Sequence, residues 1–135
     1  MRVSRADAYV DFVREKMRLL SRFRELAPSV LSVVKRVLSE YGVDDEIFFF
    51  GSIVDGKYTA ASDVDIAVVV REVPRNRSEI AGKIVEELEK IGVPSWFPLE
   101  IHFLTPDLFE ALRRGGANFV RAEDFVGTAN GANEK

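Results

Sequence analysis

The chain has 135 residues, 47% of them hydrophobic and 30% charged, which suits a single globular domain with one core. Its formal net charge of −3 argues against the basic surface of a nucleic-acid-binding protein. Since the chain contains no cysteine, disulfides, thiolate zinc sites and a cysteine nucleophile are excluded. No apolar run is long enough to span a membrane, and the first residues lack the apolar centre of a signal peptide, so we expect a cytoplasmic protein.

The first 45 residues predict two amphipathic helices. Apolar residues recur at spacings of three and four over residues 6–26 and again over residues 30–41, and Pro28 separates the two patterns. Gly42 ends the second pattern. We expect both helices to pack on the core. Lysine and arginine crowd the first helix, and we interpret them as a solvated face, with a docking surface for a partner as the alternative.

The remainder of the chain alternates short apolar strands with helices. Strands are predicted over residues 47–50, 65–71 and 97–105, with the valine-rich second strand buried on both faces. Helices are predicted from about Ser78 to Gly92 and from Pro106, after a Thr105 cap, to about Arg114. The tail lacks apolar periodicity. We therefore predict one α/β domain in three parts, which are N-terminal helices over 1–45, a core over 46–115 and a partly disordered C-terminal segment over 116–135.

Two aspartates open the valine-rich strand. Asp63 and Asp65 are two residues apart, so in an extended chain both carboxylates point to the same side. Two ionised carboxylates held together repel each other, and a divalent cation such as Mg²⁺ or Mn²⁺ removes that cost. The alternative is ordinary turn chemistry, because Ser-Asp before a strand is common in loops.

The turn that precedes these aspartates has the composition of a phosphate site. Gly51 and Ser52 follow an apolar strand and begin a predicted helical turn, where free backbone N–H groups and a hydroxyl suit phosphate oxygens. Glycine also lets a phosphate approach the backbone closely. The alternative is a simple strand-to-helix turn.

The third strand contributes another acid. Glu100 stands between Leu99 and Ile101, and an acid inside an apolar strand is unusual without a partner. Either parallel or antiparallel pairing beside the Asp65 strand would bring Glu100 to the face of the aspartates. His102 shares that face by alternation, but we interpret it as a structural strand residue. Trp96 and Phe97 are assigned to the core or to helix packing rather than to base stacking.

In combination, these motifs resemble a known family. Gly51-Ser52, the later Asp-Val-Asp at residues 63–65 and a third acid on a following strand resemble the polymerase-beta nucleotidyltransferase superfamily. The small size and the stretch SDVDIAVVV resemble its minimal nucleotidyltransferases, the MNT domains. The resemblance covers residues 47–105. It implies a small mixed sheet of three or four strands flanked by helices, with an N-terminal helical extension.

The resemblance also implies roles for these residues. Asp63, Asp65 and Glu100 would bind two Mg²⁺ ions, Gly51 and Ser52 would hold the phosphates of ATP or another nucleoside triphosphate, and Glu100 would help deprotonate an attacking hydroxyl. Such domains often carry an arginine just after the Gly-Ser, whereas this chain has Asp55 there. Lys57 is the candidate base that could take its place.

Three functions follow as hypotheses. The first is a protein adenylyltransferase that acts as an antitoxin by transferring AMP to a HEPN-type partner, in a homo- or hetero-oligomer. The second is an MNT-type module that binds a partner without catalysis, which Asp55 favours. The third is transfer to a small molecule or to RNA. The short chain leaves little room for a second substrate domain, and its acidic balance disfavours RNA.

Overall fold

Two helices begin the structure, a computed structural model that describes the backbone of residues 4–133 and the side chains of residues 4–127. α1 (Arg5–Ser21) starts at Ser4, whose hydroxyl accepts a hydrogen bond from the backbone N–H of Asp7. Arg22 lies outside helical geometry, and α2 (Phe23–Glu40) follows it at once. Pro28 is the sixth residue of α2 and does not end the helix, although it removes one hydrogen bond of the helical ladder.

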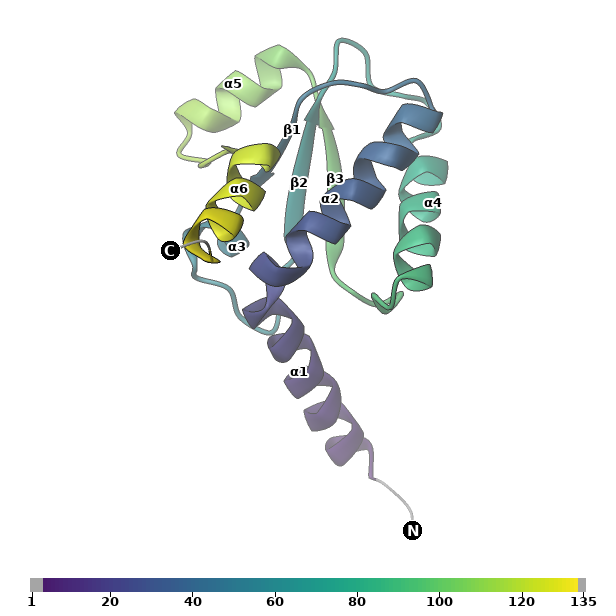
Figure 1. Ribbon diagram of the computed structural model, residues 1–135, viewed down its shortest axis with the longest axis vertical. Helices are drawn as coiled ribbons and strands as arrows, with labels where there is room; N and C mark the ends of the chain where they lie inside the picture. Colours follow the sequence, from purple (N-terminus) through teal and green to yellow (C-terminus); the bar gives the residue numbers. More distant parts are fainter. Residues whose placement is uncertain (1–3, 134–135) are drawn as a thin grey trace.

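The centre of the fold is a four-stranded mixed sheet in the order β3-β2-β1-β4 (Figure 1). Its strands are β1 (Ile47–Phe50), β2 (Val64–Val69), β3 (Leu99–Leu104) and β4 (Val120–Arg121). β1 runs antiparallel to β2 and β4, whereas β2 and β3 are parallel. Parallel neighbours need a long crossover, and α4 (Arg77–Lys90) supplies it. The predicted fold class is therefore confirmed.

The hydrophobic core lies between one face of this sheet and the helices α2, α4 and α6 (Ala122–Asn133) (Figure 1). Phe23 of α2 is 1% exposed and contacts the rings of Phe49, Phe97 and Phe125. From β2, Val64, Ile66 and Val68 enter this core, so the strand buries alternate residues here. α3 (Ser52–Asp55) is a single turn after β1, and α5 (Pro106–Arg114) lies over the opposite face, where its Phe109 contacts Phe48.

The two ends of the chain differ from expectation. α2 packs on the core as predicted, but α1 projects from the body, with Tyr9 68% and Val10 45% exposed (Figure 1). The C-terminal segment, expected to be partly disordered, instead adds β4 to the sheet and continues as α6 to Asn133; residues 134–135 lie outside the described ones. The physical reason is two anchors, since Ala122 and Phe125 are 0% and 2% exposed. Within the described part of the chain, no helix has the length and apolar character needed to cross a membrane.

Candidate active site

The pairing of β2 with β3 brings the candidate acids together. The two strands are parallel and in register, so Asp65 lies beside Glu100 and Ala67 lies beside His102. Because side chains alternate across a sheet, these residues project from the face opposite to the one that carries Val64 and Ile66 into the core. An in-register ladder therefore places two carboxylates and an imidazole at one end of the outer sheet face.

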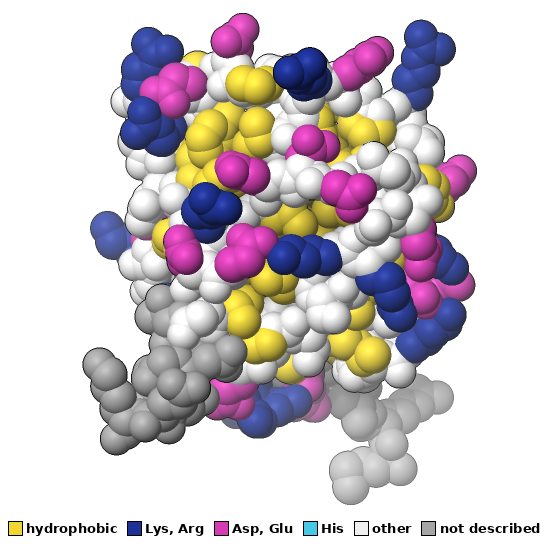
Figure 2. Space-filling model, turned by 45° about the horizontal axis from the view of Figure 1, so that its top comes forward, with side chains coloured by type: hydrophobic (Ala, Val, Ile, Leu, Met, Phe, Trp, Pro, Cys, Tyr) yellow, Lys and Arg dark blue, Asp and Glu magenta, His cyan; other side chains and the backbone are white. Residues whose placement is uncertain are grey.

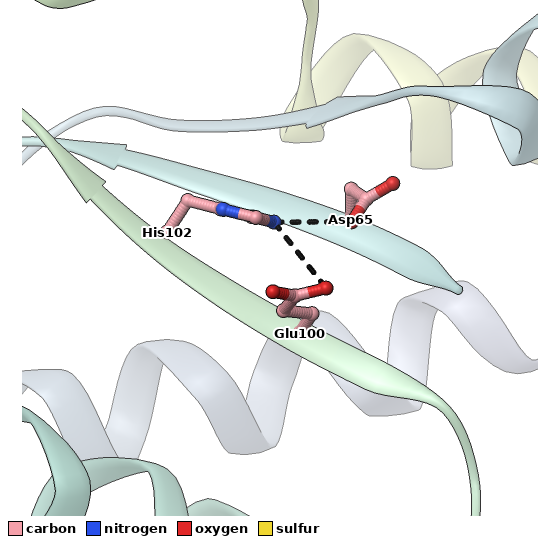
Figure 3. A group of neighbouring side chains, drawn as sticks. All are labelled: Asp65, Glu100 and His102. Atoms are coloured by element: carbon pink, nitrogen blue, oxygen red, sulfur yellow. Dashed lines mark hydrogen bonds and ion pairs between the residues drawn. The ribbon is translucent and has the colours of Figure 1, made fainter.

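The three side chains form a compact group (Figure 3). Nε2 of His102 lies 3.0 Å from Oδ1 of Asp65 and 3.8 Å from Oε2 of Glu100. One potential ligand atom of each residue lies within 4.8 Å of the others. The side chains of Asp65, His102 and Glu100 are 21%, 31% and 55% exposed, so the group opens progressively towards solvent.

Electrostatics couple His102 to the acids. The hydrogen bond with Asp65 raises the pKa of His102 above its ordinary value, against the opposing effect of partial burial. The negative charges of Glu100, Asp65 and Asp63 raise the same pKa further. The imidazole is thus drawn towards its cationic form, and it partly offsets the repulsion between the carboxylates.

Gly51 lies directly against this group. Its backbone has φ 81° and ψ −159°, a conformation that is essentially restricted to glycine. A Cβ atom added there would stand 2.5 Å from Oδ2 of Asp65, well inside van der Waals contact. Gly51 is also the residue before α3, whose first N–H groups have no partner inside the helix. The turn and the carboxylate therefore share one small space, which only glycine leaves open.

The other predicted site residues lie at varied distances from the group. Asp63 precedes β2 and is exposed, and among the described residues it does not belong to the 4.8 Å group, although its charge reaches His102. Ser52 begins α3 and is half-buried. Lys57 follows α3, is exposed and forms no ion pair within the described part of the chain. The geometry thus unites Asp65, Glu100 and Gly51, and leaves the roles of Asp63, Ser52 and Lys57 as predictions.

His102 is the residue that sequence reasoning undervalued. We interpreted it as structural, yet it is the direct hydrogen-bond partner of Asp65. The sequence feature that indicates its place beside the acids is the spacing of Glu100 and His102, which are two residues apart on one strand and so share a face. By contrast, Phe97 is in the core as expected, stacked on Phe23. Trp96 packs edge-on against Phe12 of α1, with ring centroids 5.0 Å apart.

The basic residues of the N-terminal helices are partly neutralised. Arg18 is paired with Glu15, and Arg22 with Glu25, all on exposed surface. On the face that Figure 2 shows, lysine and arginine side chains are interspersed with aspartate and glutamate. The ion pairs of Arg18 and Arg22 favour a solvated helix face over a basic docking surface in this part of the chain.

The donor set fits a hard divalent cation. Carboxylate oxygens from Asp65 and Glu100 are the ligand type that Mg²⁺ and Mn²⁺ prefer, and an imidazole nitrogen suits the latter better than the former. A glycine turn with free N–H groups beside such a cation suits the phosphates of a nucleotide.

Comparison with known families agrees with this chemistry. The model of a family described as nucleotidyltransferase domain matches residues 30–118, which is more than half of the 135-residue chain. The match begins in α2, includes every residue of the site and ends just before β4. A search of curated proteins returned no match. The resemblance inferred from the sequence is confirmed: the chain belongs to the nucleotidyltransferase domain family, within the polymerase-beta superfamily.

Proposed function

We propose that the protein transfers a nucleoside monophosphate, AMP from ATP, to a hydroxyl group on a HEPN-type partner protein in the cytoplasm and so acts as an antitoxin. Family membership supports nucleotidyl transfer in general. The single observation that carries the site assignment is the in-register pairing of Asp65 with Glu100 beside the Gly51 turn. The nucleotide, the acceptor and the antitoxin role are parts of the proposal.

Each residue has a role in this scheme. Asp63, Asp65 and Glu100 would hold two Mg²⁺ ions, which when bound neutralise charge on a triphosphate and its leaving group. Gly51 and Ser52 would bind the phosphates through backbone N–H groups and the serine hydroxyl, and Lys57 would add a positive charge. Glu100, with its side chain 55% exposed, would accept the proton of the incoming hydroxyl. His102 would orient Asp65 through their 3.0 Å hydrogen bond.

The partner assignment rests on the resemblance to MNT domains. A hydroxyl of a separate protein is a suitable acceptor because Glu100 and Asp65 lie on the outer sheet face, where the side chain of Glu100 is 55% exposed. A large substrate can therefore reach them without entering a deep pocket.

The test is transfer of label from α-³²P-ATP to a HEPN partner with and without Mg²⁺. We expect label on the partner with the wild-type chain, and none with Asp65→Asn or Glu100→Gln, or after chelation of the metal. Arg71→Ala, an exposed change outside the group, is the matched control and should keep activity. If wild type and Asp65→Asn transfer equally little label, the enzyme proposal fails.

A second candidate is a binding module without turnover. Two observations favour it, namely Asp55 in the place of a phosphate-binding base and the pairing of Asp65 with His102, which satisfies the acid without a metal. Calorimetry separates the two candidates. A binding module should bind the partner equally well after Asp65→Asn and should show no Mg²⁺-dependent heat with ATP, whereas the enzyme should show that heat and lose it in the variant.

A further inference from the structure

α1 buries few of its side chains against the rest of the fold. Of its 17 residues, all of them described, only Leu20 at its C-terminal end is buried. Three of its apolar side chains are exposed, namely Tyr9 at 68%, Val10 at 45% and Phe12 at 42%. The N-terminal end of the helix points away from the rest of the fold (Figure 1). Most of the stability of a helix in a protein comes from the packing of its apolar face, so α1, with little of that face covered, would gain stability from a second surface.

The apolar stripe follows a regular repeat. Its members are separated alternately by four and three residues, as in helices that pair along a seam; they are Ala6, Val10, Val13, Met17 and Leu20. The same repeat continues in α2 as Ala27, Leu31, Val34 and Leu38, all of which are buried. In α2 the sheet and other helices cover the stripe, whereas the described residues give the first turns of α1 no such cover.

Two charges flank this stripe on one side. Asp7 and Arg14 are seven residues apart, two turns along the helix, and neither forms an ion pair among the described residues. Glu15 and Arg18, further round the helix, bind each other instead. The contact of Phe12 with Trp96 places the body beside the other flank, so the side of Asp7 and Arg14 remains open.

We propose that α1 pairs with α1 of a second copy of the chain, in antiparallel orientation. Two-fold symmetry would then set Val10 of each copy against Val13 of the other, and Ala6 against Met17, whose side chain is already half-buried against its own core. The same register sets Asp7 of each copy beside Arg14 of the other, which creates two equivalent ion pairs. A parallel pair would place Arg14 beside Tyr9 and Asp7 beside Arg2, so the antiparallel form is the one that pairs both Asp7 and Arg14 with an opposite charge.

This arrangement places the two bodies at opposite ends of the paired helices. The outer sheet face with Asp65 and Glu100 stays open in each copy, so pairing does not depend on the proposed transferase activity. Because the register pairs residues 6–17, which is less than two heptads, we expect a dimer of modest strength, formed at about micromolar to 100 µM chain.

The test is sedimentation equilibrium of the full chain and of charge-reversed variants. We expect a dimer for wild type, and dissociation constants raised about tenfold by Asp7→Arg and by Arg14→Asp, because two attractions become two repulsions. The double variant Asp7→Arg/Arg14→Asp should return to within about threefold of wild type, since the pairs are restored with reversed sign. Glu15→Arg, with the same charge change on the far side of the helix, is the matched control and should leave the dimer intact.

The double variant is decisive because Asp7 also lies in the first turn, where an acid stabilises a helix. A general weakening of α1 would persist in the double variant, whereas a lost contact between copies would be restored. Val10→Asp should abolish the dimer without lowering the melting temperature of the body. A monomeric wild-type chain at about 100 µM, a dimer unaffected by Val10→Asp, or a double variant as weak as Asp7→Arg would each overturn the proposal.

Discussion

The two faces of the sheet show how one strand can serve two purposes. On the inner face, Phe49, Val64 and Ile66 are 0% exposed beneath α2, α4 and α6. The outer face is divided along its length. One end has an apolar cluster with Phe48 and Leu104 beneath α5, and the other end has the open group of Asp65, Glu100 and His102.

The difference follows from the cost of burial. A carboxylate on the inner face would lose its hydration with no partner, which is expensive in an apolar core. On the outer face Asp65 keeps contact with solvent and gains His102. Alternation along β2 therefore directs Val64 and Ile66 to the core and Asp65 to the candidate site, and the two assignments can be tested separately.

The largest expected effect is on the inner face. Phe49→Ala should lower the free energy of unfolding by about 3–5 kcal/mol, because it removes a fully buried ring that contacts Phe23 and Phe125. Phe50→Ala, its neighbour on the half-exposed outer face, is the control and should lose roughly 2 kcal/mol or less. Urea denaturation measures both. Equal losses would mean that the two faces contribute alike.

On the outer face the expected effect is on activity rather than on stability. Asp65→Asn should reduce nucleotidyl transfer by roughly 10²–10³-fold, since a neutral amide cannot balance the charge of a bound metal and triphosphate. The melting temperature should change little, because Asp65 is half-buried and bonds only His102 among its described side-chain contacts. Labelled-ATP transfer and thermal unfolding, measured on the same preparation, separate the two. Loss of activity in step with loss of folding would contradict the assignment.

Substitution of Gly51, in the turn between β1 and α3, should have an effect of intermediate size on stability. Gly51→Ala should destabilise the fold by roughly 2–3 kcal/mol, because it combines a glycine-only conformation with a Cβ 2.5 Å from Asp65. Gly56→Ala is a matched control, since Gly56 also has positive φ, 72°, but nothing lies within 4 Å of an added Cβ. There we expect only about 1 kcal/mol. If both variants lose the same amount of stability, the close approach to Asp65 has no energetic effect.

The smallest expected effect is a pH dependence that arises on the outer face. The pKa of His102 is raised in the folded metal-free protein, so its stabilising contribution is complete below the ordinary value of 6.5 and is lost as the pH rises through the raised folded pKa. Unfolding with a chelator present, between about pH 5.5 and 9, should show this decline, and His102→Asn should flatten it. If the free energy of unfolding falls more steeply with pH in His102→Asn than in wild type, His102 does not make the stabilising contribution that we assign to it.

The sequence predicted most of the inner face because burial leaves a periodic signature. The valines of β2 and the spacing of α4 indicated their elements directly, and Asp65 and Glu100 stood out as acids in apolar strands. The meeting of Asp65 with Glu100 follows once the strands pair in parallel, but that orientation depends on the crossover and cannot be seen in either strand alone.

Other features were beyond local patterns. β4 has only two residues, too few to show alternation, and its place beside β1 is set by tertiary contact. The polar composition after Phe125 did not indicate α6, whose first residues include the buried Ala122 and Phe125. α1 and α2 have the same apolar repeat, so the sequence did not distinguish the helix that the body covers from the one that extends beyond it.

The parallel ladder between β2 and β3 also sets where the chain tolerates changes in length. The loop between β2 and α4, residues 71–76, can gain or lose residues without separating Asp65 from Glu100, because the ladder aligns them, whereas α4 itself is fixed by its buried residues. One residue inserted between Glu100 and His102 would instead place these two side chains on opposite faces of the sheet, because side chains alternate along a strand. Homologous chains should therefore vary in length within the loop before α4 and keep a constant spacing within the strands themselves.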